Sequence, residues 1–286
     1  MILRNEKEMF DLILNYANSD DRVLAVGLNG SRTNKNVPKD EFQDYDVVFV
    51  VDNVFSFIDD PTWIDYFGDR IIMQKPESME LFPPSLGGMF SYLMLFEDKN
   101  RIDLILCPKE QKDNWHRGDK LSKILLDKGN YLSKIADSTD EDYHISKPNK
   151  QKFLDCCNEF WWVSTYVVKG LCRDEIFYAT DHLYNNLSSE LLRMVSWKVG
   201  IDYGFDFSIG KNYKYIKNYI DENTYNKLLS LLDMSSKEKI WTSLEATQCM
   251  FDKFAKEVSS YLDYSYEDQG FEKVLLYTKE YKDKYI

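Results

Sequence analysis

The sequence predicts an α+β protein in which a mixed-sheet domain is followed by a bundle of α-helices. Over the first 110 residues, short apolar runs of strand length alternate with polar loops. From about residue 150, apolar residues instead recur at helical spacing over long stretches. We place the boundary in the polar segment 140–150, which gives an N-terminal domain of residues 1–145 and a C-terminal helical domain of residues 146–286.

The first domain is expected to begin with a helix over residues 5–18, where apolar positions recur between charged ones. A further helical stretch is expected near residues 53–67, and a connecting helix near residues 121–126, where Leu121, Ile124, Leu125 and Leu126 cluster. Strands are expected over five apolar runs, at residues 22–30, 46–51, 70–74, 90–96 and 101–107. These elements predict a mixed sheet with flanking helices.

Four apolar patterns with helical spacing are expected to build the second domain. They run over residues 153–168, 176–195, 212–232 and 236–262. Residues 263–286 are rich in Tyr, Glu and Lys, and we expect them to form a polar tail or a last short helix.

Charge and composition narrow the class of partner. The chain has 48 acidic and 36 basic residues and a formal net charge of -12, which disfavours nucleic acid and favours a cationic small molecule. Its five cysteines form no CxxC pair, and no apolar run reaches the roughly 20 residues that cross a bilayer. We therefore expect a cytoplasmic protein with no membrane partner, either a monomer or a homodimer.

Three aspartates lie at the start of, or inside, apolar strands. Asp44 and Asp46 begin the strand at 46–51, and Asp103 interrupts the apolar run at 101–107. Side chains at i and i+2 of a strand point to the same face, about 7 Å apart. Each aspartate alone fits a strand cap or an edge charge. On neighbouring strands, however, they predict a site for hard cations that prefer oxygen ligands.

The dipeptide Gly30-Ser31 ends the first strand and opens a polar turn. Glycine lets backbone N–H groups approach an anion, and serine adds a hydroxyl donor. Arg32 and Lys35 follow and are expected to neutralise phosphate charge. A Gly-Ser pair alone is an ordinary turn, but its combination with the aspartates predicts a phosphate-binding site.

The order Gly30-Ser31, a spacer, Asp44-Tyr45-Asp46 and a later Asp103 resembles the signature of the polymerase-β-like nucleotidyltransferases. Much of the chain is similar to one branch of them, the aminoglycoside 6-adenylyltransferases that inactivate streptomycin. The similarity runs through both domains, in segments 30–34, 42–46, 73–77, 79–84, 96–98, 155–161, 163–170, 191–194 and 210–214.

The resemblance implies a cleft between the two domains, with ATP as co-substrate and two Mg²⁺ ions on the carboxylate strands. It implies transfer of AMP to a hydroxyl of a cationic aminoglycoside, with the 6-hydroxyl of streptomycin as the expected acceptor. Asp44 and Asp46 are expected to bind the metal. Asp103 either completes the metal site or takes the proton of the acceptor hydroxyl.

We also expect residues outside the carboxylate group to take part in binding. The nucleotide is expected to contact Gly30, Ser31, Arg32 and Lys169. The aminoglycoside is expected to contact Glu159, Trp162, Tyr166 and Asp181. Lys169 also fits a lysine that complements the dipole at the end of a helix.

Two alternatives remain open. In the first, the protein is a nucleotidyltransferase whose acceptor is another hydroxylated antibiotic or a protein side chain. In the second, the protein is a nucleotide-binding regulator that binds ATP without releasing pyrophosphate. The presence of all three aspartates favours an enzyme over a regulator.

Overall fold

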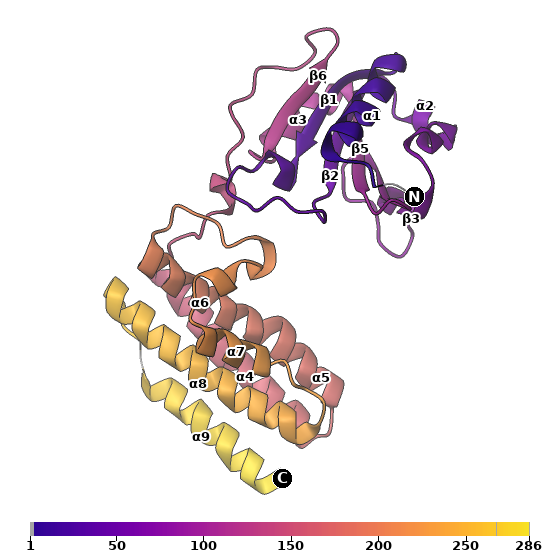
Figure 1. The fold of residues 1–286 in the computed structure, drawn as a ribbon. Coiled ribbons are helices and arrows are strands. Elements are labelled where there is room, and N and C mark those ends of the chain that lie inside the picture. Colours follow the sequence, from indigo (N-terminus) through magenta and orange to yellow (C-terminus); the bar gives the residue numbers. More distant parts are fainter. Residues whose placement is uncertain (1–2, 267, 286) are drawn as a thin grey trace. The chain divides into compact units, whose positions relative to one another are not determined.

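The chain folds into two compact units, Met1–Asp142 and Tyr143–Ile286. The computed structural model describes residues 3–266 and 268–285. Figure 1 shows a sheet with short helices in the first unit and a group of long helices in the second. The predicted α+β class is confirmed. Within the described residues, no helix has both the length and the apolar composition needed to cross a membrane.

The described strands of the first unit form one six-stranded mixed sheet in the order β3-β4-β5-β2-β1-β6. β2 and β5 run parallel, and the other neighbouring strands run antiparallel. The five predicted strands are confirmed. The strand bounds are Val23–Asn29 (β1), Tyr45–Val51 (β2), Arg70–Gln74 (β3), Phe90–Phe96 (β4), Arg101–Pro108 (β5) and Ser122–Asp127 (β6).

The predicted connecting helix at residues 121–126 is wrong, because these residues form the edge strand β6. β6 pairs with β1 from Ser122, opposite Asn29, to Asp127, opposite Ala25. A run of apolar residues this short fits either a helix or a strand. The backbone groups of β1 need partners on this side, and β6 supplies them from almost 100 residues later in the chain, which local sequence does not reveal.

The two faces of the sheet have different covers. Helix α1 (Glu6–Ser19), capped by Asn5, packs on the face that carries Val47, Phe49 and Val51. With it pack the short helix α2 (Phe55–Ile58) and the 3₁₀ helix Pro61–Phe67, so the predicted helical stretch 53–67 is split. The opposite face carries Val48 and Val50 and is covered in part by α3 (Lys112–Arg117). Strand alternation places Asp46 on this second face.

The regular elements described in the second unit are all helical. They begin at side-chain caps where the chain offers one, such as Asn149 for α4 and Ser236 for α8. Their core includes Phe160 stacked on Phe251, with 3.7 Å between ring centroids. The α-helix bounds are Lys150–Cys172 (α4), Ile176–Asp181 (α5), Ser188–Tyr203 (α6), Glu222–Ser230 (α7), Lys237–Leu262 (α8) and Asp268–Tyr285 (α9).

Three details of the bundle differ from the sequence-based expectation. The pattern at 176–195 contains a π-helical segment, His182–Leu187, between α5 and α6. The pattern at 212–232 becomes two 3₁₀ turns followed by α7. Its first part cannot be α-helical because Asn212 and Tyr213 have positive φ angles of 55° and 60°. The last helix, α9, is 18 residues long rather than short.

Candidate functional site

The three predicted aspartates come together at the start of the parallel strands β2 and β5. Asp46 lies directly opposite Asp103 in the register of this pair, and Asp44 is the residue before β2. Because side chains alternate along a strand, Asp46 and Asp103 share the face that α3 covers only in part. The rigid hydrogen-bonded pair of strands therefore positions two carboxylates side by side.

The electrostatics of this group show a shortage of positive charge. The pKa of Asp46 is raised to about 6, first by burial and then by the negative charges of Asp103 and Asp44, with Arg101 opposing the rise. Carboxylate oxygens that repel one another are the donors that a hard divalent cation such as Mg²⁺ prefers. The donor set therefore fits magnesium chemically.

The cation that faces these carboxylates in the structure is Arg101. Its Nε and Nη2 atoms donate to the two carboxylate oxygens of Asp103, each at 2.7 Å. The same guanidinium approaches Asp44 at 3.7 Å. Among the described residues, no three Asp, Glu, His or Cys side chains are already gathered as metal ligands. The carboxylates have the right chemistry for a metal, but Asp103 is engaged by arginine.

Gly30 closes one side of the carboxylate group. It has a φ of +71°, and a Cβ atom placed there would lie 2.3 Å from Oδ2 of Asp46. Both observations require glycine at this position. The N–H of Gly30 donates to the carbonyl oxygen of Leu121 at 2.9 Å. Gly30 therefore shapes the site through its missing side chain, and its own N–H group is already used. Ser31 follows it in the 3₁₀ turn Gly30–Thr33.

Arg32 is held against the segment that leads into β2. Its guanidinium stacks on the ring of Tyr45, with 3.6 Å to the centroid. Its Nε donates to the carbonyl oxygen of Asp44 at 3.0 Å, and Nη2 donates to that of Gln43 at 2.7 Å. These contacts fix the backbone around Asp44. Phosphate binding by Arg32 stays a prediction.

Positive charge also gathers beside the Gly30-Ser31 turn. A pocket of about 540 Å³ lies between this turn, the loop after it and β6. Lys35, predicted to neutralise phosphate, is one of its lining residues. The cations that line it are Arg32, Lys35, Lys39, Lys123 and Lys134. In a chain with net charge -12, this is a local reversal of sign that suits an anionic group.

In the second unit, four predicted residues lie along one side of α4. Glu159, Trp162, Tyr166 and Lys169 are three or four positions apart, which is the spacing of one helix face. Trp162 donates through Nε1 to the hydroxyl of Tyr166 at 2.8 Å. The Nζ of Lys169 lies 4.8 Å from the centroid of the Tyr166 ring. The structure thus brings three of the four into contact. Lys169 is also in the last turn of α4, so its alternative role toward the helix dipole stays open.

Asp181 ends α5 and accepts a hydrogen bond from Asn185 at 2.7 Å. The next residue, His182, packs edge-on against Tyr166 with 5.5 Å between ring centroids. Asp181 is therefore close in the chain to the aromatic group of α4. It lies where the π-helical segment begins, and π segments are frequent at functional sites.

Glu159 lines a separate pocket of about 380 Å³ between α4 and α6. Two other carboxylates of this pocket were not predicted as site residues: Asp155, one turn before Glu159 on α4, and Glu190 on α6. The i, i+4 spacing of Asp155 and Glu159 was a usable signal, whereas Glu190 joins them only through helix packing. The lining residues are Ser146, Lys152, Asp155, Cys156, Glu159, Glu190, Arg193 and Trp197.

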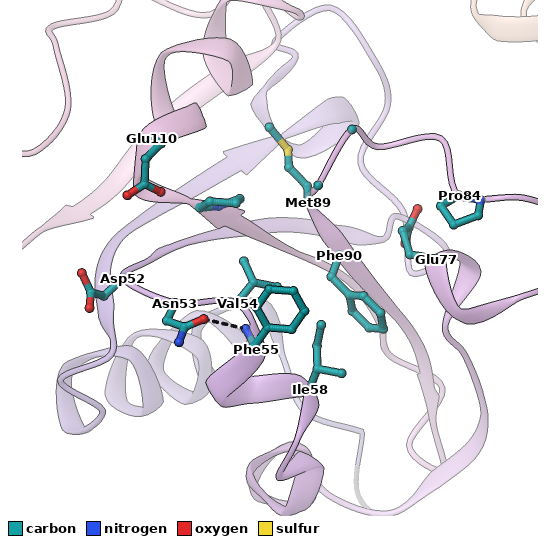
Figure 2. A pocket seen from close by; sticks show the side chains of 13 residues that line it. Asp52, Asn53, Val54, Phe55, Ile58, Glu77, Pro84, Met89, Phe90 and Glu110 are labelled. Atoms are coloured by element: carbon teal, nitrogen blue, oxygen red, sulfur yellow. Dashed lines mark hydrogen bonds between the residues drawn. The ribbon is translucent and has the colours of Figure 1, made fainter.

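A third pocket, of about 390 Å³, lies at the other end of the sheet (Figure 2). Asp52, which follows β2, and Glu110, which follows β5, flank it, and Phe55 and Phe90 form part of its apolar wall. The three aspartates lie where β2 and β5 begin, about 20 Å away for strands of this length. This pocket is therefore separate from the carboxylate site.

Comparison with known proteins gives consistent matches over nearly the whole chain. Residues 3–281 match the family described as streptomycin adenylyltransferase. An aminoglycoside 6-adenylyltransferase of Campylobacter jejuni is 50% identical, over 99% of this chain and 98% of the relative. Proteins of the same name from Bacillus subtilis and Staphylococcus aureus are 46% and 42% identical, over 93% and 92% of this chain and 94% of each relative.

A solved structure of an aminoglycoside 6-adenyltransferase from Bacillus subtilis is 40% identical. The match covers 98% of this chain and 99% of that one, with a TM-score of 0.49.

Proposed function

The chain belongs to the streptomycin adenylyltransferase family, and on this premise we propose that it transfers AMP from ATP to a hydroxyl of an aminoglycoside. The 6-hydroxyl of streptomycin is the expected acceptor, and the product is an inactivated antibiotic. The observation that carries the proposal is the pairing of Asp46 with Asp103 beside Asp44 and Gly30. Grouped carboxylates of this kind are suited to an enzyme that binds the phosphates of a nucleotide through a metal ion.

The reaction is an in-line displacement, in which the acceptor oxygen attacks the α-phosphorus of ATP and pyrophosphate leaves. Magnesium, when bound, supplies neutralising charge at the phosphate oxygens. Asp44 and Asp46 are the residues that would hold it, because both are at the start of β2 and the negative charge of Asp44 helps to raise the pKa of Asp46. Asp103, opposite Asp46, is placed either to take the proton of the acceptor hydroxyl or to complete the metal site.

Residues of the first unit also shape the nucleotide site. Arg32 holds the backbone of Asp44 in place, and Gly30 leaves room for the carboxylate of Asp46. The cations beside the Gly30-Ser31 turn favour a polyphosphate chain nearby. Lys169 of the second unit stays a proposed ligand of the nucleotide.

The second unit supplies the chemistry that a polycationic acceptor needs. The pocket between α4 and α6 offers the exposed carboxylates of Asp155 and Glu159, the carboxylate of Glu190, which pairs with Arg193, and the indole of Trp197. Amino and guanidino groups pair with such carboxylates, and sugar or cyclitol rings pack on aromatic faces. We extend the predicted acceptor site of Glu159, Trp162, Tyr166 and Asp181 to include Asp155 and Glu190.

A pyrophosphate-release assay with ATP, magnesium and a panel of aminoglycosides tests the function. Streptomycin should give release and gain the mass of one AMP unit, and NMR of the product should place the new phosphodiester. Other antibiotic classes serve as controls. ATP binding without pyrophosphate release, whichever acceptor is added, would favour the non-catalytic regulator instead.

A further inference from the structure

Arg101 contacts the same carboxylates that are proposed to bind a metal ion. Its guanidinium engages both oxygens of Asp103 at 2.7 Å and approaches Asp44 at 3.7 Å. A bidentate pair of this kind uses one lone pair of each carboxylate oxygen and places a full positive charge against the carboxylate. As long as it persists, a second cation binds Asp103 less tightly, because the two cations repel each other.

The local structure makes this arginine able to leave. Arg101 is the first residue of β5, two positions before Asp103, so strand alternation puts both side chains on one face. The Arg101 side chain is 43% exposed, whereas that of Asp103 is 19% exposed. The carboxylate is fixed within the strand, but the arginine ends in solvent on a long flexible stem. Moving the guanidinium outward exposes a charge that water can hydrate.

We propose that Arg101 is a displaceable counter-cation, which neutralises Asp103 until a divalent cation binds and then withdraws from it. This inference rests on the proposed function, since it concerns the metal requirement of the same site. The physical reason is competition. A guanidinium and a divalent cation need the same carboxylate oxygens, and two cations within a few ångströms repel each other. Arg101 therefore lowers the affinity of the site for metal alone.

The opposite arrangement makes a different prediction. If Arg101 were a permanent partner that orients Asp103 toward the metal, removing it would weaken metal binding. If Arg101 competes with the metal, removing it strengthens metal binding. The sign of the change in metal affinity therefore decides between the two roles.

The test uses the full chain, freed of divalent cations and without nucleotide or aminoglycoside. Mn²⁺ is the probe, because it takes the same oxygen ligands as Mg²⁺ and free Mn²⁺ is counted by electron paramagnetic resonance. The Arg101→Gln variant should bind Mn²⁺ about tenfold more tightly than the unchanged protein. Arg101→Lys keeps the charge but loses the bidentate pair, and it should fall between the two.

Arg70→Gln is the matched control. Arg70 also begins a strand and pairs with an acid, Asp65, but it lies on β3 away from the aspartates. Its Mn²⁺ affinity should be unchanged. Thermal unfolding with and without Mn²⁺ reports folding, and Mn²⁺ should raise the Tm of Arg101→Gln more than that of the unchanged protein. Unchanged or weaker Mn²⁺ binding by folded Arg101→Gln and Arg101→Lys would overturn the proposal. Because no turnover is measured, a failure of the proposed activity would leave this result interpretable.

Discussion

The two units carry carboxylates in contrasting arrangements. In the first unit, Asp46 and Asp103 are fixed opposite each other by the register of two parallel strands. In the second unit, Asp155 and Glu159 are exposed one turn apart on α4, and Glu190 of α6 pairs with Arg193 at 2.8 Å. The neighbouring negative charges raise the pKa of Asp46, and carboxylates held this close together suit one small, highly charged cation. The carboxylates of Asp155 and Glu159 are exposed to water, and together with Glu190 they are spread over two helices, which suits the dispersed charges of a polycation.

The largest expected effect on activity comes from removing one negative charge from the aspartates of the first unit. Asp46→Asn keeps the side-chain volume but removes the negative charge of a proposed metal ligand, so kcat should fall by about 10³-fold or more while the fold is retained. Steady-state pyrophosphate release and circular dichroism measure the two properties. Asp52→Asn is the control, since Asp52 follows the same strand at its other end. Near-normal turnover by Asp46→Asn at unchanged magnesium would remove Asp46 from the site.

A smaller but still large effect is expected from crowding the same group. Gly30→Ala introduces a Cβ atom 2.3 Å from Oδ2 of Asp46 at a positive φ, which displaces the carboxylate. We expect a loss of about 10²-fold in kcat/KM and a stability loss of about 1 kcal/mol.

The control for this substitution is Gly87→Ala. Gly87 also has a positive φ, of +60°, but a Cβ atom added there would have no neighbour within 4 Å. Its stability should fall similarly, and its activity should not. Equal activity losses in the two variants would show that backbone strain alone, and no contact with Asp46, causes the effect.

The second carboxylate group should affect binding more than chemistry. Glu159→Gln is expected to raise the KM for streptomycin about tenfold, with little change in kcat, because a carboxylate that only holds the acceptor would stabilise the ground state and the transition state alike. Glu257→Gln on α8 removes the same charge outside the pocket and should leave KM unchanged. A fall in kcat at constant KM in Glu159→Gln would place Glu159 in the chemical step instead.

The KM of the unchanged protein for streptomycin should also rise with ionic strength, because screening by salt weakens the attraction between the acidic protein and a cationic substrate.

The last expected effect is on stability and not on activity, and it concerns a carboxylate that already has its partners. Burial alone would raise the pKa of Asp98, but hydrogen bonds from Arg4 and Asn100 outweigh it and hold the pKa well below its usual value. The ionised form therefore stabilises the fold above about pH 4, and this contribution is lost as the pH falls further. Asp98→Asn should cost roughly 2 kcal/mol at pH 7.

Urea unfolding of both proteins at pH 7 and pH 3 measures this difference. The gap between Asp98→Asn and the unchanged protein should narrow at pH 3, where the native carboxylate begins to lose its advantage. A gap of the same size at both values would mean that packing, and not the charge, accounts for the role of Asp98.

Much of the fold was accessible from local patterns. Strongly apolar runs such as 46–51 predict strands because the alternating side chains are buried on both faces, and the long repeats of α4 and α8 predict helices. The run at 121–126 was mispredicted because its strand conformation depends on pairing with β1. The backbone at Asn212 and Tyr213 was missed because positive φ angles are uncommon for residues other than glycine and do not follow from an apolar repeat.

The sequence by itself determined the candidate chemistry: a glycine-serine turn, three aspartates in strand contexts and an acidic chain suited to a cation. These features are local, since residue type and spacing fix which groups share a strand face or a helix face. Only the tertiary structure decided that Asp103 lies opposite Asp46. It alone placed Glu190 beside Glu159 in one pocket. Such contacts join residues far apart in the chain, and their energies depend on distances that no sequence pattern specifies.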